Sequence, residues 1–147
     1  MIDRSTPDLG GLFQELILEH YKKPRNRGSL DDATVHVHMN NPTCGDEVHL
    51  YLKLDGDTIR EVGFEGVGCS ISQASISMMT QLLEGTTVED ALDLYERFKE
   101  MMHGDQEAAT DKRLKDARAL AGVSRFPARI KCALLGWNAL EKAVAEE

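Results

Sequence analysis

The chain has 147 residues, of which 41% are hydrophobic and 29% are charged, and its formal net charge is −8. These values are typical of one globular domain with a real core, and we expect residues 1–147 to form a single domain. The acidic balance offers no basic stripe for phosphates, so we expect no nucleic-acid partner. The short basic run Lys22–Arg27 reads as a loop surface or a protein docking site.

No apolar stretch has the length needed to cross a bilayer, and the first ten residues carry no signal-peptide core. We therefore expect no membrane partner and a cytoplasmic location. In a reducing compartment thiols remain unoxidised, which favours metal-binding or catalytic roles for cysteine.

The chain begins with a polar stretch, residues 1–8, that we expect to be a loose leader. Helical spacing of apolar residues predicts a helix over Leu9–Tyr21, with Asp8 as a candidate cap. Pro24 and Gly28 are expected to end it.

Three strands are predicted next, over Thr34–Met39, Glu47–Leu54 and Thr58–Glu65. The middle strand alternates strictly between apolar and polar residues. Asp55-Gly56-Asp57 is a hairpin turn, and the change of phase between Ile59 and Val62 indicates a bulge.

The remainder of the chain reads as helical. Helices are predicted over Ser70–Glu84, Val88–Met102, Lys112–Ala121 and Pro127–Glu146, with a polar loop over Gly104–Thr110. Strands grouped before helices indicate an α+β fold. We expect a three-stranded antiparallel sheet with helices packed mainly on one face.

The three cysteines, Cys44, Cys69 and Cys132, each stand in a distinctive local context, and Asp46 follows the first of them by two residues. An odd number of cysteines cannot all pair as disulfides. Three thiolates and one carboxylate supply four ligands, the number that a tetrahedral zinc ion takes. The alternative is that these are ordinary buried cysteines, which are common in protein cores.

The predicted elements place the cysteines where side chains can converge. Cys44 falls between the first two strands, Cys69 between the third strand and its helix, and Cys132 in the first turns of the last helix. Gly45, Gly66 and Gly68 allow tight bends and close backbone approach. Such a site would carry excess negative charge, which Arg129 and Lys131 could balance.

Histidines offer a weaker metal candidate. His36 and His38 lie on the same face of the first strand and could bind a metal, although an exposed strand face explains them at least as well. His49 alternates onto a polar face and is expected to be simply exposed. His20 lies on a helix stripe, where packing is a better explanation than metal binding.

Four stretches of the chain carry a resemblance to a known family: His20–Gly28, Asn41–Asp46, Gly66–Ser75 and Arg129–Cys132. Together they resemble the U-type iron–sulfur cluster assembly proteins, the IscU/NifU-N-like family. Scaffold members of the IscU type have a histidine immediately before the third cysteine, where this chain has Lys131. The segment Glu100–Ser124 also lengthens the gap before that cysteine, and both features are similar to the SufU branch.

The resemblance to the SufU branch implies a zinc-dependent sulfurtransferase that works with a SufS-type cysteine desulfurase. It implies that Cys44, Asp46, Cys69 and Cys132 are the zinc ligands and that Cys44 is the thiol that accepts persulfide sulfur. The sulfur would pass to a downstream iron–sulfur scaffold.

Two other functions remain open at the level of sequence. The same ligands could hold a [2Fe–2S] cluster with one non-cysteine ligand, as in an IscU-type scaffold. A zinc-stabilised interaction module without sulfur chemistry is the third possibility. The metal present after purification and persulfide labelling by a desulfurase would distinguish the three.

Overall fold

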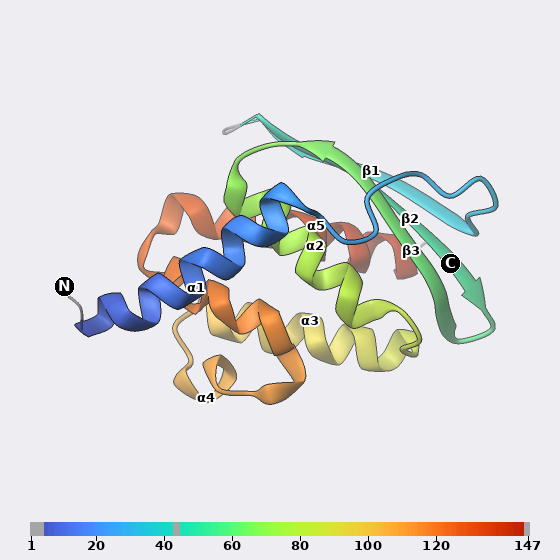
Figure 1. Ribbon diagram of the computed structural model, residues 1–147. Helices are drawn as coiled ribbons and strands as arrows, with labels where there is room; N and C mark the ends of the chain where they lie inside the picture. The colour runs from blue at the N-terminus through green and yellow to red at the C-terminus, as the bar shows by residue number, and fades with distance from the viewer. Residues whose placement is uncertain (1–4, 43–44, 146–147) are drawn as a thin grey trace.

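The computed structural model describes residues 5–42 and 45–145, and it describes the side chains from Gln14 onward within these ranges. Cys44 therefore lies outside the described residues. In chain order the elements are α1 (Ser5–Lys22), β1 (Val35–Asn41), β2 (Asp46–Asp55), β3 (Thr58–Val67), α2 (Ser70–Leu83), α3 (Val88–Met102), α4 (Gln106–Ala109), the 3₁₀ segment η1 (Lys112–Arg125) and α5 (Pro127–Ala145). Figure 1 shows the sheet along one side of the molecule and the helices on the other.

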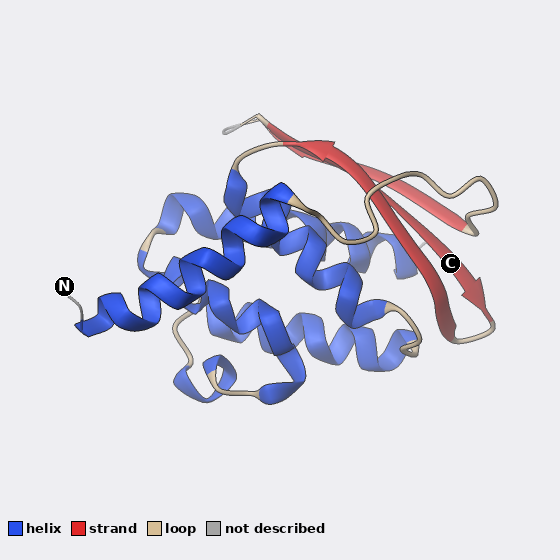
Figure 2. Cartoon of the chain, viewed as in Figure 1, coloured by secondary structure: helices blue, strands red, loops and turns tan. Residues whose placement is uncertain are grey.

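The three strands form one antiparallel sheet in the order β1-β2-β3, which confirms the predicted α+β architecture. Along β2 the apolar residues Val48, Leu50 and Leu52 are buried, while the residues between them are partly exposed. One face of the sheet therefore lies on the helices and the other faces solvent (Figure 2). Helix α5 packs against β1 and β2, and α2 packs against β3.

The predicted bulge is present in β3. Lys53 pairs with Glu61, but the next residue, Leu54, pairs with Ile59, so Arg60 is the extra residue. The hairpin turn also forms as predicted, since Gly56 adopts a φ of 61° between β2 and β3. In this left-handed region a side chain would be strained.

Among the described residues, one cluster of buried apolar side chains joins the sheet to α2, α3, η1 and α5. Trp137 of α5 stacks on Phe98 of α3 with ring centroids 4.6 Å apart and donates its Nε1–H to Ser75 Oγ at 3.2 Å. Within the ranges that the structure describes, no helix is both long and apolar enough to span a membrane.

The start of α1 and the segment between α3 and η1 differ from the predictions. Helix α1 begins at Ser5, so Asp8 lies inside the helix, and residues 5–8 of the expected leader are helical. The predicted loop 104–110 contains the short helix α4, which starts because the Asp105 side chain accepts the N–H groups of Glu107 and Ala108. A helix of this length leaves no hydrophobic periodicity to read.

The helix predicted over 112–121 is a 3₁₀ segment that continues to Arg125 and is broken at Lys115, whose φ is 49°. The other strand and helix boundaries lie within two residues of the predicted ones, and α3 coincides with its prediction.

Candidate metal centre

Three of the four predicted ligands meet at one point. Asp46 begins β2, Cys69 precedes the first residue of α2, and Cys132 lies early in α5. One carboxylate oxygen and the two sulfur atoms all lie within 4.8 Å of one another. Stretches far apart in the sequence thus supply an oxygen and two sulfurs to a common position.

The Asp46 carboxylate is fixed by the backbone that carries Cys69. Its Oδ1 accepts the Cys69 N–H at 3.0 Å, and its Oδ2 lies 3.9 Å from Cys69 Sγ. The side chain is only 1% exposed. A carboxylate held in this way in a buried position has little freedom, which suits a ligand that must be positioned before the ion arrives.

The glycines before Cys69 allow this close approach. A Cβ atom at Gly68 would lie 2.5 Å from Asp46 Oδ1 and 2.5 Å from Ser72 Oγ, and one at Gly66 would lie 2.3 Å from the Glu47 carbonyl oxygen. A side chain at Gly66 would therefore push the β2 backbone away from β3, and one at Gly68 would displace the Asp46 carboxylate and the Ser72 hydroxyl. The structure confirms the close backbone approach that the sequence predicted here.

The two described thiols differ in exposure. Cys132 is 1% exposed and lies with its Sγ 3.9 Å from the Ala128 carbonyl oxygen one turn earlier in α5. Cys69 is partly exposed. Arg129 and Lys131, the expected neighbouring cations, are both exposed at the start of α5.

The fourth predicted ligand, Cys44, lies outside the described residues, but the ends of its loop are defined. Asn41 and Asp46 form the last pair of the β1–β2 ladder, and the Gly45 N–H donates to the Asn41 carbonyl oxygen at 2.8 Å. Gly45 has a φ of 78°, which agrees with the predicted tight bend next to Asp46.

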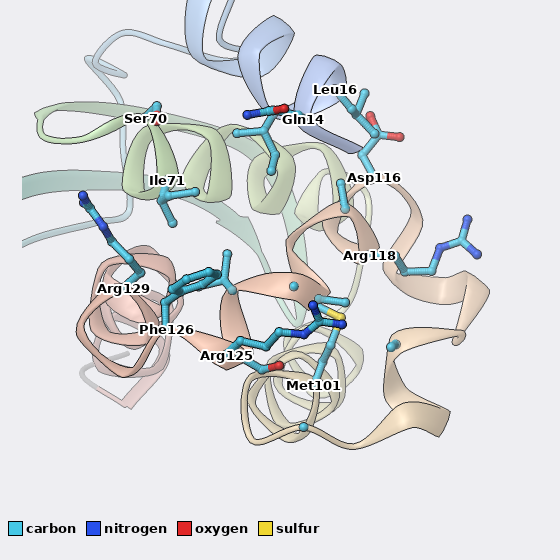
Figure 3. Close-up of a pocket in the computed structure, with 18 of the residues that line it drawn as sticks. Gln14, Leu16, Ser70, Ile71, Met101, Asp116, Arg118, Arg125, Phe126 and Arg129 are labelled. Carbon is cyan, nitrogen blue, oxygen red and sulfur yellow. The ribbon is translucent and has the colours of Figure 1, made fainter. Parts of the chain in front are cut away.

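A groove of about 1200 Å³ reaches Cys69 from the helical side of the molecule. Its walls come from α1, the start of α2, the end of α3 with α4, η1 and the start of α5; Figure 3 shows Ser70 and Ile71 on one wall and Phe126 and Arg129 on another. Phe126 is 60% exposed. The basic side chains along the groove are Lys115, Arg118, Arg125 and Arg129.

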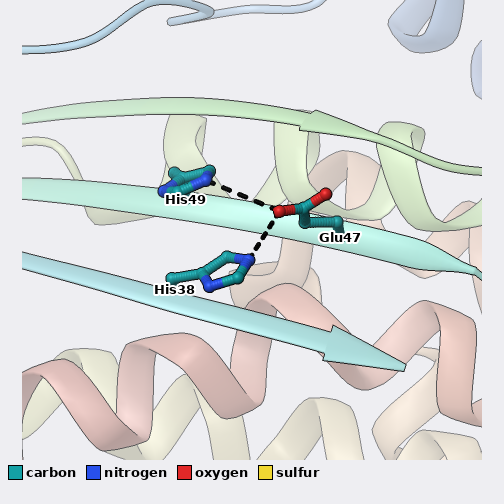
Figure 4. Close-up of side chains that lie close together, drawn as sticks. All are labelled: His38, Glu47 and His49. Carbon is teal, nitrogen blue, oxygen red and sulfur yellow. Dashed lines mark hydrogen bonds and ion pairs between the residues drawn. The ribbon is translucent and has the colours of Figure 1, made fainter. Parts of the chain in front are cut away.

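Of the histidines, His20 agrees with the sequence interpretation, and the grouping around His38 differs from it. His20 is buried and bonded through Nδ1 to Ser77 Oγ at 2.7 Å and through Nε2 to Asp116 Oδ2 at 2.9 Å, so it is packed as expected. His38 gathers with His49 and Glu47 on the solvent side of the sheet (Figure 4). The sequence pointed to His36 and His38 as a pair; it did not indicate Glu47, because the pairing of β1 with β2 was unknown.

The chain is similar to known proteins over most of its length. Residues 12–146 match the family model of the NifU-like N terminal domain. The chain is 54% identical over 140 residues to the zinc-dependent sulfurtransferase SufU of Bacillus subtilis, covering 95% of this chain and 94% of that protein. It is 46% identical over 136 residues to the iron–sulfur cluster assembly scaffold protein IscU of Streptococcus pyogenes, covering 92% and 84%.

The fold is also similar to that of a solved structure. The fold superposes with a TM-score of 0.78 on a proposed iron–sulfur cluster assembly scaffold protein for the SUF system from Fervidobacterium islandicum, at 36% identity, over 88% of this chain and 94% of that one. Since the family model spans nearly the whole sequence, the chain belongs to the NifU-like N-terminal domain family.

Proposed function

We propose that this protein is a zinc-dependent sulfurtransferase for iron–sulfur cluster assembly. It accepts sulfur from the persulfide of a SufS-type cysteine desulfurase on Cys44 and passes it to a downstream iron–sulfur scaffold. The observation that carries the proposal is the meeting of Asp46, Cys69 and Cys132 within 4.8 Å. The similarity to SufU of Bacillus subtilis supports zinc as the metal and sulfur transfer as the activity.

The described donors fit a zinc ion. Two thiolate sulfurs and one carboxylate oxygen are ligands that zinc accepts, and three protein segments hold them in place. Cys44 would complete the set of four, because it stands two residues from Asp46 and the chain can then separate their Cα atoms by only about 7 Å. When bound, zinc supplies the positive charge that keeps the thiols in the thiolate form.

The transfer step uses Cys44 as the nucleophile. Its thiolate attacks the terminal sulfur of the desulfurase persulfide and forms a new S–S bond, while the original S–S bond breaks and the desulfurase cysteine leaves as a thiolate. The persulfide is then on Cys44, with no net change in oxidation state across the two proteins. Gly45 suits this role, because a bend beside the nucleophile lets the thiol turn towards a partner.

The groove next to Cys69 offers the docking surface for the desulfurase. It carries an exposed aromatic side chain, Phe126, and four basic side chains against two acidic ones, Asp105 and Asp116, in a chain of net charge −8. Aromatic and arginine side chains are the residues that most often dominate binding energy at interfaces. We therefore infer that an acidic and apolar surface of the desulfurase covers the groove, in the cytoplasm where such a partner works.

The test is Cys44→Ala, assayed with a SufS-type desulfurase and cysteine. We expect stimulation of the desulfurase to collapse and no persulfide label to appear on this chain. The matched control is His103→Ala, which changes an exposed residue at the end of α3. It should leave the stimulation of the desulfurase and the persulfide label unchanged. Persulfide transfer that survives in Cys44→Ala would overturn the assignment.

An IscU-type scaffold is the second candidate, and the 46% identity to the Streptococcus pyogenes IscU favours it. The same oxygen and sulfur donors could hold a [2Fe–2S] cluster. Metal analysis of the purified protein separates the two: one zinc and no iron absorbance supports the sulfurtransferase, whereas a brown, iron-containing protein that hands on an intact cluster supports the scaffold.

A further inference from the structure

The solvent face of the sheet carries a second group of metal-ligating side chains, separate from the candidate metal centre. His38, Glu47 and His49 each point one ligand atom into a common region, and these atoms lie within 4.8 Å of one another. Two imidazoles and one carboxylate are a donor set that proteins use for zinc and for other divalent transition metals.

The strand pairing explains why these three residues meet. His38 of β1 lies directly opposite His49 of β2, and Glu47 is two residues from His49 on the same strand. Because side chains alternate between the two faces of a strand, residues two apart share a face. All three therefore stand on the face that the helices leave uncovered, on adjacent strands whose relative position is fixed by the ladder.

The distances are close to those of a bound metal. A single oxygen, Glu47 Oε2, lies 2.6 Å from His38 Nε2 and 3.7 Å from His49 Nε2 (Figure 4). Ligand atoms about 2.1 Å from a tetrahedral zinc ion are roughly 3.4 Å apart. The first distance must open by about 0.8 Å and the second must close by about 0.3 Å. The side chains of His38, Glu47 and His49 are 46%, 43% and 34% exposed, so they have room for this change.

A fourth residue, His36, orients the site. Its Nε2 lies 3.0 Å from His49 Nδ1, so the hydrogen bond occupies the nitrogen of His49 that faces away from Glu47. His36 in turn stacks on Tyr51, with ring centroids 4.4 Å apart, and the His38 and His49 rings stack at 4.4 Å. Metal-ligating histidines characteristically bond through the second ring nitrogen in this way, which fixes the ring and directs the other nitrogen to the ion.

We propose that His38, Glu47 and His49 form a second metal site, which binds a divalent transition metal ion of the zinc type, with His36 as a positioning residue. Three protein ligands leave a fourth position for water or for a ligand atom of a partner. The site is independent of the thiol centre: Glu47 and Asp46 are neighbours on β2, but Asp46 is buried on the helical side. The two sites also differ in donor type, since this one contains no sulfur.

The experiment is a titration of the full chain, without a histidine tag, with Zn²⁺ by calorimetry and with Co²⁺ by absorbance. We expect two equivalents in the wild-type protein. One gives the intense sulfur-to-cobalt charge-transfer band of thiolate ligation, and the other binds without it. The imidazole ¹⁵N resonances of His38 and His49 should shift only with the second equivalent.

Four variants and one control show which residues bind the second equivalent. We expect no second equivalent, and an unchanged thiolate band, in His38→Gln, His49→Gln and Glu47→Gln. In His36→Gln the affinity for the second equivalent should fall on the order of 10-fold. His103→Gln, which removes an exposed histidine elsewhere, should bind both equivalents. Since the substituted side chains are partly exposed, we expect each variant to fold, and circular dichroism checks this.

The outcomes separate this site from the proposed function. A wild-type protein that binds one equivalent only, or a His38→Gln and a His49→Gln variant that bind the second as His103→Gln does, would overturn the second site. Absence of the thiolate band would instead count against the zinc centre of the sulfurtransferase. The histidine site would then still be tested by the equivalent that binds without that band.

Discussion

Asp46 has two separate functions in the structure. Its Oδ1 accepts the backbone N–H of Cys69, and the carboxylate lies among the thiols of the candidate metal centre. The first contact fixes the beginning of α2 against β2, and the second is the ligand role that we propose for the carboxylate. Substitutions that differ in which contact they remove can separate the two.

We predict that Asp46→Asn and Asp46→Ala both weaken zinc binding by more than about 10-fold, because each removes the charged ligand. Only Asp46→Ala should also lower the free energy of unfolding of the metal-free protein, by about 1 kcal/mol, since it leaves the partly buried Cys69 N–H without its acceptor. Competition with a zinc chelator measures the first effect and urea denaturation the second. Wild-type zinc affinity in Asp46→Asn would show that the carboxylate is no ligand.

At the scale of single residues, the sequence indicated the sulfur and oxygen donors but not their distances. Cys69 and Asp46 stood out because of neighbouring glycines, and Cys132 because it completes the set of cysteines and lies in a stretch similar to a known family. His49 and Glu47 did not, since either residue alone is an ordinary polar position on an alternating strand. Only the pairing of His38 with His49 shows that these side chains lie together.

Among the elements, η1 is tied to the rest of the helical layer by polar contacts. His20 of α1 bridges Ser77 of α2 and Asp116 of η1, and Ser77 Oγ also accepts the Arg25 N–H at 2.8 Å. At its start, η1 is joined to α3 through Asp111. The Asp111 side chain accepts the Arg113 N–H and is paired with the guanidinium groups of Arg113 and Arg97.

These contacts make the stability of η1 depend on pH. The hydrogen bond from the Arg113 side chain is the largest influence that holds the pKa of Asp111 well below its usual 3.8, and Arg97 adds to it. A depressed pKa means that folding favours the carboxylate. Its stabilising contribution is therefore fully present above about pH 4 and is lost as the pH falls towards the folded-state pKa.

We predict that Asp111→Asn lowers the free energy of unfolding at pH 7 by about 1 kcal/mol, because the amide still caps η1 but cannot form the ion pairs. The difference from wild type should narrow as the pH falls below about 4 and the wild-type carboxylate takes up its proton. Urea denaturation of both metal-free proteins over this pH series tests it. A constant difference at every pH would contradict the ion-pair explanation, and Asp105→Asn, another capping position, serves as the control.

The elements that the sequence predicted well are those with a strong local pattern. The alternation along β2 and the apolar stripe of α3 each fixed an element almost to the residue. Segment η1 escaped a correct description because its break at Lys115 depends on packing against α1 and α3, which no local pattern encodes. Helix α4 was missed because a capped single turn resembles a polar loop.

For the molecule as a whole, the groove beside Cys69 is the feature that links the helical layer to the proposed chemistry. Segment η1 contributes one wall of it, so the part of the chain that lengthens the gap between Cys69 and Cys132 also shapes the surface next to the thiols. We expect the desulfurase to be recognised here and the sulfur to be accepted nearby. Binding and transfer should then be separable by mutation.

We predict that the double variant Arg125→Glu/Phe126→Ser raises the concentration of this protein needed for half-maximal desulfurase stimulation by about 10-fold or more, since it removes an aromatic anchor and reverses a charge. Zinc content should stay at the wild-type level, because neither residue is among the predicted ligands. Arg60→Glu, at the bulge of β3 away from the groove, is the matched control. Equal stimulation by the double variant and the control would place the docking surface elsewhere.

The overall architecture was predictable because strands precede helices in the sequence and hydrophobic residues mark one face of each. The groove was not, since its walls come from several segments whose separation in space is set by packing. The convergence of Asp46 with Cys69 and Cys132 was expected from where the predicted elements end, and the resemblance to known proteins added to this, because the gaps between these residues carry no spacing signal.

The neighbouring carboxylates at the start of β2 limit the insertions and deletions that this strand can accept. Asp46 is directed inward to sulfur and Glu47 outward to imidazole, and both depend on the same ladder with β1. Removing one residue from this strand would turn each side chain to the opposite face and disable both positions together. A change of one residue in this strand is therefore tolerated only where a bulge absorbs it, as Arg60 does in β3, and we expect the start of β2 to tolerate insertions and deletions less well than the hairpin at Gly56.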